Sequence, residues 1–174
     1  MNAMKQHVSQ QQGFTLIELL LYAGIAAALL LVVSLFLSTL LGSRIKNQTI
    51  AEVEGQGAAA LQLITQTIRN ASGINTPSPG SNASTLSLIV DDSGSDPTVF
   101  DVASGALRVK EGSSGAIALT NSRVIVSNLT VSNFSRSGTL GTIRVEYTIT
   151  AKNVSGRNEY SFSKTFLASA TLRH

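Results

Sequence analysis

The sequence predicts an α+β protein in which one long N-terminal helix packs on an antiparallel β-sheet. Two observations lead to this prediction: a long apolar run early in the 174-residue chain, and a change of hydrophobic period after it. The first part repeats apolar residues at helical spacing, whereas roughly the last hundred residues alternate apolar and polar side chains as strands do. A composition of 43% hydrophobic and 13% charged residues also fits a folded chain, because disordered chains are rich in charge.

Residues 14–41 read FTLIELLLYAGIAAALLLVVSLFLSTLL, with Glu18 as the only charge. A membrane-spanning helix needs about 20 apolar residues, whereas the apolar core of a cleavable signal peptide has only about 7–15. A buried core helix is disfavoured, because so small a domain cannot surround this segment on every side. The run therefore predicts a transmembrane helix. Lys5 precedes it and Arg44 and Lys46 follow it, so the positive-inside rule is close to a tie and slightly favours an extracytoplasmic N-terminus.

Residues 42–73 are expected to continue this helix in amphipathic form. Gly55 and Gly57 each cost roughly 1 kcal/mol relative to Ala, so the helix is expected to bend or loosen there. Gly73, followed closely by Pro77, should end it. One stripe carries the apolar residues that are spaced by three and four: Leu61, Ile64, Ile68 and Ala71.

Residues 74–174 are predicted to form a β-rich domain. Residues 99–103 and 106–110 read as a hairpin around Ser104-Gly105. In the last strand, residues of one parity are apolar except Lys164, so either the register slips or one end of the strand faces water. We expect about six antiparallel strands to cover the apolar stripe of the helix. The further candidate strands lie within residues 86–90, 117–119, 124–134, 143–149 and 160–168.

The composition disfavours an enzyme. The chain has no Cys, which excludes a disulfide scaffold, a thiolate zinc site and a Cys nucleophile. His7 and His174, the only two histidines, lie near opposite ends of the chain. The sequence has no phosphate-binding loop and no nucleophile elbow, although its abundant Ser leaves a membrane-tethered serine hydrolase as an alternative.

The apolar run opens with a distinctive motif, Gly-Phe-Thr-Leu-Ile-Glu, at residues 13–18. This motif resembles the type IV pilin-like family, which includes type IV pilins, minor pilins and type II secretion pseudopilins. Gly13, Phe14 and Glu18 match the family pattern one by one. Residues 119–129 and 170–173 are also similar to the J-type minor pseudopilins. The resemblance implies a pilin-like fold and a structural role in a filament or its tip complex.

The resemblance assigns roles to three residues. A prepilin peptidase would remove the leader, residues 1–13, by cleaving after Gly13, and would methylate the new amine of Phe14. A residue without Cβ at position 13 lets the scissile bond approach the catalytic groups of the peptidase. A carboxylate in an apolar helix is costly and is usually paired. Glu18 would pair with the Phe14 amine of a neighbouring subunit in the filament.

The resemblance also implies the location and the partners. Before assembly the chain would cross the cytoplasmic (inner) membrane once, with a cytoplasmic N-terminus and with residues 74–174 outside. It would then join a cell-surface pilus or a periplasmic pseudopilus with other pilin or pseudopilin subunits. Many major pilins have a proline in the first helix, where the filament form can lose helicity, whereas residues 14–76 contain none here. Many also have two cysteines that staple a C-terminal loop, and the absence of cysteine from this chain favours a minor subunit. The alternative is a single-span protein with an extracytoplasmic β domain for adhesion or binding, which would keep residues 1–13 and would not need Glu18.

Two further ligands, Ca²⁺ and nucleic acid, are suggested by the charged residues. Asp91, Asp92, Asp96 and Asp101 offer oxygen ligands that suit Ca²⁺, but their spacing is not that of an EF-hand and is more typical of a turn. No cofactor is therefore predicted, with Ca²⁺ as the alternative. Nucleic acid is the other candidate ligand, but the basic residues are interleaved with Glu111, Glu146 and Glu159, which favours a solvated surface. The basic residues concerned are Arg108, Lys110, Arg123, Arg136, Arg144, Lys152, Arg157 and Lys164.

Overall fold

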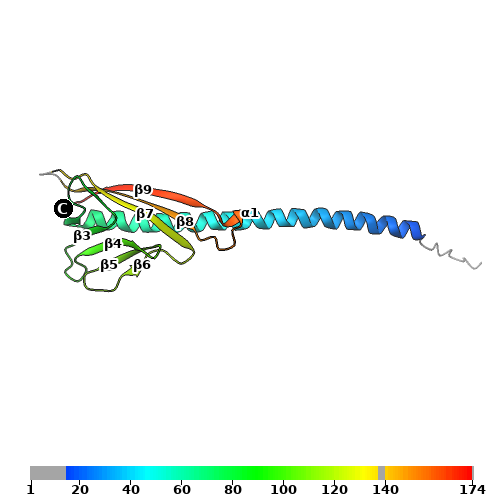
Figure 1. The fold of residues 1–174 in the computed structure, drawn as a ribbon, viewed down its shortest axis with the longest axis horizontal. Coiled ribbons are helices and arrows are strands. Elements are labelled where there is room, and N and C mark those ends of the chain that lie inside the picture. The colour runs from blue at the N-terminus through cyan, green and yellow to red at the C-terminus, as the bar shows by residue number, and fades with distance from the viewer. Residues whose placement is uncertain (1–14, 137–139, 174) are drawn as a thin grey trace, which may run out of the picture. The chain divides into compact units, whose positions relative to one another are not determined.

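The computed structural model describes residues 15–136 and 140–173. One long helix and a set of antiparallel strands give the α+β layout that the sequence predicts. The chain divides into two compact units, Met1–Gly42 and Ser43–His174. The described part of the first unit consists of the beginning of the helix, whereas the second unit contains the rest of the helix and all of the strands (Figure 1).

Helix α1 runs over Leu16–Asn70, 55 residues without interruption. Gly55 and Gly57 therefore do not interrupt the helix. The helix ends at Asn70, three residues before the predicted end at residue 73. Gly73 is instead the first residue of strand β1. Arg69 in the last turn carries a charge of the sign that the helix C-terminus favours.

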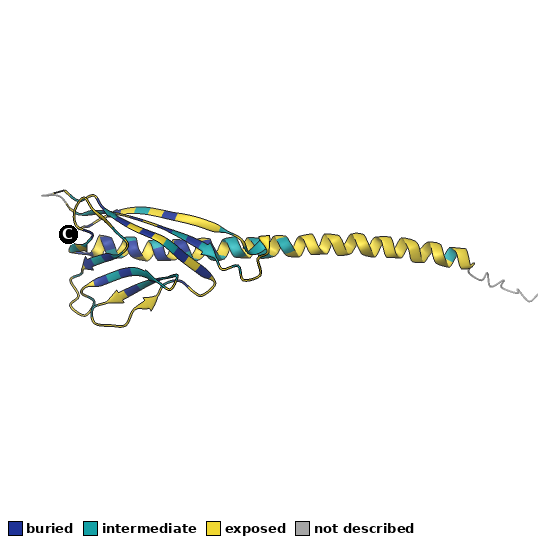
Figure 2. Ribbon diagram, in the orientation of Figure 1, coloured by how far each residue is buried: buried dark blue, intermediate teal, exposed yellow. Residues whose placement is uncertain are grey.

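The part of α1 in the second unit buries a narrow stripe of small and apolar residues. Its members are spaced by three or four, as one face of a helix requires. Figure 2 shows this stripe as the dark blue residues of α1. The buried residues of the helix are Val53, Gly57, Ala60, Ile64 and Ile68. Ile64 and Ile68 were predicted, Leu61 is only partly buried, and the stripe extends further toward the N-terminus than the sequence pattern indicated.

Nine strands among the described residues form two antiparallel sheets. The first sheet has the order β1 (Gly73–Thr76), β3 (Leu86–Ile89), β4 (Thr98–Ala103), β5 (Ala106–Glu111), β6 (Ile117–Ala118). The second has the order β2 (Asn82–Ala83), β7 (Val124–Asn133), β8 (Thr142–Ala151), β9 (Ser163–Thr171), and the 3₁₀ helix η1 (Asn158–Tyr160) lies between β8 and β9.

The single sheet of about six strands expected from the sequence is therefore wrong, because nine strands form two sheets in the described residues. Strands β1 and β2 were not predicted, and β9 begins at Ser163 and not at residue 160. The antiparallel pairing is as predicted. Alternation tells which side of a strand is apolar but not which strand it pairs with. Apolar residues from both sheets join the helix stripe in one core, which includes Leu88, Phe100 and Leu107 from the first sheet and Val131 and Tyr147 from the second. Dividing the strands between two sheets lets both cover the same helix.

Two local features match or refine the predicted strands. The hairpin of β4 and β5 is confirmed: Ser104 and Gly105 have φ of 52° and 75°, as a two-residue type I′ turn requires. In β7, Asn128 has φ 55° at a break in register. This bulge shifts the buried parity from Val126 to Leu129, so both residues face the core.

The last strand, β9, shows no slip in register, and its first residues are exposed to water. Phe166 and Ala170 are buried, whereas Lys164 on the same parity is exposed. The ammonium of Lys164 lies 2.5 Å from the carboxylate of Glu54 on α1. The interruption of the apolar pattern thus marks the point where the strand reaches the edge of the core.

Candidate functional site

The most unusual surface of the chain is the first part of α1. By length and composition this helix is apolar enough to cross a membrane, and none of its most apolar window is buried in the described structure. Large apolar side chains such as Leu30, Val32 and Phe36 are more than 60% exposed. Contiguous apolar surface of this extent is unfavourable in water and marks a site of contact with membrane or protein.

Glu18 is the acidic residue of the first turn of α1, where a negative charge is favoured by the helix dipole. Its backbone N–H donates to the hydroxyl of Thr15 over 3.3 Å, and the N–H of Leu19 donates to the carbonyl of Thr15 over 3.1 Å. Thr15 is therefore the N-cap of the helix, and Glu18 occupies the third helical position. Thr-x-x-Glu is the sequence pattern of a capping box. This pattern at residues 15–18 is a local signal for the start of the helix that sequence reasoning missed.

Gly13 and Phe14, the predicted cleavage and methylation residues, lie outside the described residues. Of the three predicted motif residues the structure thus describes Glu18, which is half-buried within the chain itself.

The predicted acidic cluster is held by a turn. Asp92 accepts hydrogen bonds from the Ser95 hydroxyl at 2.8 Å and from the Gly94 N–H at 3.1 Å, and these bonds, the Ser95 one foremost, lower the pKa of its carboxyl. Asp96 accepts from the N–H of Val90 over 3.2 Å. Among the described residues, no three His, Cys, Asp or Glu side chains are grouped so that they could hold a metal ion.

Asp101 takes no part in that turn. Its two oxygens accept from the Arg108 guanidinium over 2.9 and 2.6 Å across the β4–β5 hairpin. Asp91, the remaining candidate ligand, is exposed.

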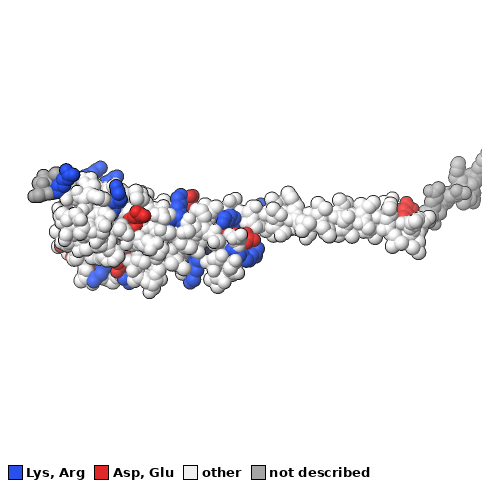
Figure 3. Space-filling model, turned by 45° about the horizontal axis from the view of Figure 1, so that its top comes forward, with Lys and Arg blue, Asp and Glu red and all other residues white. Residues whose placement is uncertain are grey.

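Several of the basic residues considered for nucleic acid are engaged locally. Arg157 pairs with Glu159, Lys164 with Glu54, and the Arg144 guanidinium lies 4.9 Å from the ring centre of Phe134. Figure 3 shows Lys and Arg distributed over the folded unit with acidic residues among them.

The second unit carries a groove of about 900 Å³ that sequence reasoning missed. Three segments far apart in the chain form it: α1 beyond position 44, the segment before β7, and the region between β8 and η1. Because strand pairing brings these segments together, no local sequence signal could have found it. Its lining residues are Ile45, Gln48, Thr49, Ala51, Glu52, Ser122, Arg123, Ala151, Lys152, Val154 and Tyr160.

The groove is lined by more positive than negative side chains: Arg123 and Lys152 against Glu52. Glu52 accepts a 2.6 Å hydrogen bond from Asn121 and lies 3.9 Å from the Arg123 guanidinium. The Lys152 N–H donates to the Arg123 carbonyl over 2.8 Å, which sets these two cations on neighbouring segments. With these two cations and one carboxylate in its lining, the groove has a charge that favours an anionic group.

Comparison of the chain with protein-family models, with curated proteins and with solved structures found no significant match.

Proposed function

We propose that this chain is a minor pilin or pseudopilin, a structural subunit of a type IV pilus-like or type II secretion filament or of its tip complex. The observation that supports this most directly is the exposed apolar segment of α1, which bears one acidic residue, Glu18, in its first turn. A bilayer would cover this segment before assembly, and neighbouring helices would cover it in a filament.

The motif at residues 13–18 supplies the chemistry of assembly in this proposal. Prepilin peptidase cleaves after Gly13, and the new amine of Phe14 is methylated and stays cationic. Glu18 of an incoming subunit pairs with this amine on a neighbour. In a low-dielectric helix bundle, leaving either charge alone is strongly unfavourable, so the pair selects one register of packing.

The two parts of α1 differ in what covers them, which agrees with this proposal. From Val53 onward one face of the helix is covered by the sheets of its own chain. That stripe is therefore not available to other subunits, whereas the segment before Gly42 is exposed on nearly every side and can pack between chains.

A second candidate is a single-span membrane protein with an extracytoplasmic β domain for adhesion or binding. The place of Glu18 in the first turn of α1 favours it, because the helix dipole stabilises a carboxylate there without any neighbouring subunit. This candidate does not account for Gly13 and Phe14 beside it.

The experiment that separates the two is the mass of the N-terminal peptide of the membrane-extracted protein, with and without a co-expressed prepilin peptidase. The filament proposal expects a chain that begins at N-methylated Phe14 only when the peptidase is present. An intact Met1 terminus beside an active peptidase would overturn it and leave the anchored domain.

A further inference from the structure

One face of α1 carries polar residues directly after the apolar segment. Arg44, Gln48 and Glu52 are spaced by four, so they lie on the same side of the helix. Gln48 and Glu52 line the groove described above, and Arg44, exposed, lies one turn before them. Arg44 follows Leu41, the last residue of the apolar run, by three positions.

The segment between β8 and β9 brings apolar and aromatic groups to the same place. Val154 is 88% exposed, and Tyr160 of η1 is half-buried at the groove. The ammonium of Lys46 holds this segment to α1, because it donates to the carbonyls of Ser161 at 2.7 Å and Asn158 at 3.4 Å. These residues therefore stay beside the turn of the helix that follows the apolar run.

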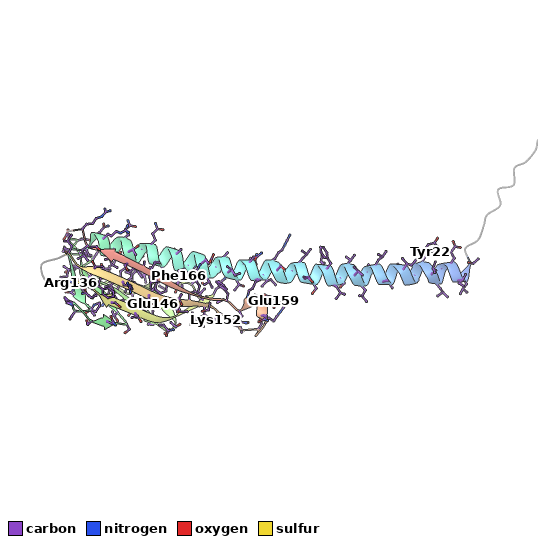
Figure 4. The ribbon with its side chains drawn as sticks, turned by 90° about the horizontal axis from the view of Figure 1, so that it is seen from above. Tyr22, Arg136, Glu146, Lys152, Glu159 and Phe166 are labelled. Carbon is purple, nitrogen blue, oxygen red and sulfur yellow. The ribbon has the colours of Figure 1, made fainter. Side chains whose placement is uncertain are left out.

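Positive charge predominates on this surface, which we call the basic rim and define as Arg44, Arg123, Lys152, Val154, Arg157 and Tyr160. Among the described residues, neither Arg44 nor Lys152 forms an ion pair. Arg123 is 79% exposed at its side chain. Figure 4 shows Lys152 and Glu159 at one end of the folded unit and Arg136 at the other. Glu159 pairs with Arg157 at 2.9 Å and Glu52 lies 3.9 Å from Arg123, so the four cations of the rim exceed these two carboxylates by two charges.

We propose that the basic rim binds the headgroups of anionic phospholipids at the surface of the membrane that α1 crosses. This inference rests on the membrane anchoring in the proposed function. Arg and Lys side chains adjoining a span reach toward phosphate groups while their stems cover apolar surface. Tyr is favoured at the headgroup level, and inserting the exposed Val154, which lines the same groove, into that layer removes apolar surface from water. Cation, aromatic and aliphatic groups together match a lipid surface better than a soluble anion.

The absence of cysteine from the chain allows a sharp test. The full chain is reconstituted in vesicles of phosphatidylcholine, with and without one third phosphatidylglycerol, and with a headgroup nitroxide lipid as quencher. Val154→Cys carries an environment-sensitive fluorophore. The control label is at Ser93→Cys, in the exposed turn that follows Ile89. Ile89 pairs with Gly73, just beyond the C-terminal end of α1, so this label lies at the end of the helix away from the rim.

Two charge variants complete the design. Arg123→Gln with Lys152→Gln removes two charges from the basic rim. Lys110→Gln with Arg173→Gln removes two charges from exposed positions outside it. Thermal unfolding of each variant checks the fold, and Lys152→Gln alone replaces the first pair if that pair unfolds early.

We expect the label at position 154 to be quenched more than the label at position 93, and more with phosphatidylglycerol than without. Each charge removed from the rim should lower the ratio of lipid-bound to free states about fivefold. High salt should lower it too, and the control pair should leave it unchanged. Equal quenching at both positions, no effect of anionic lipid, or no effect of the rim variants would overturn the proposal.

Resistance of the reconstituted chain to alkaline extraction keeps this inference separate from the proposed function. A chain that stays in the vesicles but shows no rim quenching contradicts the headgroup contact alone. A chain that is extracted contradicts the anchoring and with it both proposals. Shielding of position 154 only after a purified partner subunit is added would show that a protein covers the rim, which also overturns the lipid proposal.

Discussion

The phenolic oxygen of Tyr147 lies 2.8 Å from the main-chain carbonyl oxygen of Gly57, to which it donates a buried hydrogen bond. The ring of Tyr147 on β8 stacks on that of Phe166 on β9, with ring centres 5.7 Å apart and planes inclined by 22°. The Phe166 ring in turn occupies the space where a side chain at position 57 would begin. One residue from each of three elements thus sets the position of the second sheet on α1.

Tyr147→Phe should lower the free energy of unfolding by about 1 kcal/mol, the usual value of a neutral hydrogen bond. The loss is modest because the carbonyl of Gly57 keeps its helical partner, and the ring keeps its contacts. Chemical denaturation of the full chain in detergent measures it. Tyr160→Phe is the matched control, since the Tyr160 ring is only half-buried, and we expect it to change stability little. Equal losses from the two variants would contradict the role given to the Tyr147 bond.

Alkaline pH should weaken the second unit through the same residue. Burial raises the pKa of the Tyr147 phenol well above its ordinary value, which is about 10. The unfolded chain therefore loses this proton at a lower pH than the folded chain. The stability is fully present below about pH 10 and falls as the pH rises above it.

Comparison with Tyr147→Phe isolates this effect from the titration of lysines. The advantage of the natural chain over the variant should shrink above about pH 10 and then reverse. Denaturation midpoints of both proteins, measured across that range, test it. A constant difference between the two midpoints would show that Tyr147 titrates normally in the folded chain.

Gly55→Ala and Gly57→Ala should have opposite effects, although the two positions lie in the same helix. A Cβ at position 57 would overlap the Phe166 ring, so this variant should lose about 1–3 kcal/mol. A Cβ at position 55 meets no atom within 4 Å, so that variant should gain about 0.5–1 kcal/mol from helix propensity. Thermal unfolding monitored by circular dichroism measures both. A gain in both variants would mean that Phe166 moves aside at little cost.

Glu18→Gln separates the two roles considered for that carboxylate. Gln also serves at the third position of a capping box, so a purely local role predicts normal behaviour. If the charge pairs with the Phe14 amine of a neighbour, the variant should still insert and be cleaved but should fail to enter filaments, because removing one partner of a buried pair costs about 3–5 kcal/mol. Immunoblots of sheared filaments and of membranes distinguish these results.

Thr15→Ala is the complementary variant. It removes the cap hydroxyl and keeps the charge of Glu18, so it should weaken the helix start by about 1 kcal/mol and leave assembly largely intact. Filament entry lost in Thr15→Ala but kept in Glu18→Gln would reverse the assignment.

Much of the fold was readable from the sequence because its signals are local. The apolar run, the helical spacing of Ile64 and Ile68, and the alternation in β8 each depend on residues close in the chain. The Ser104-Gly105 turn was found for the same reason, since its backbone needs two positive φ angles in succession. The motif at residues 13–18 is local as well, and it supports the functional proposal without the tertiary structure.

The sequence by itself determined the long helix, its apolar segment, strands β3 to β9 and the antiparallel class. Only the tertiary structure decided the division into two sheets, the packing of the Phe166 ring against Gly57, and the groove beside Arg123 and Lys152. The physical reason is that periodicity says which side of an element is apolar but not which element covers it. Gly57 shows this most plainly: in the sequence it is a residue that weakens a helix, and in the folded chain its missing side chain is the space that a ring fills.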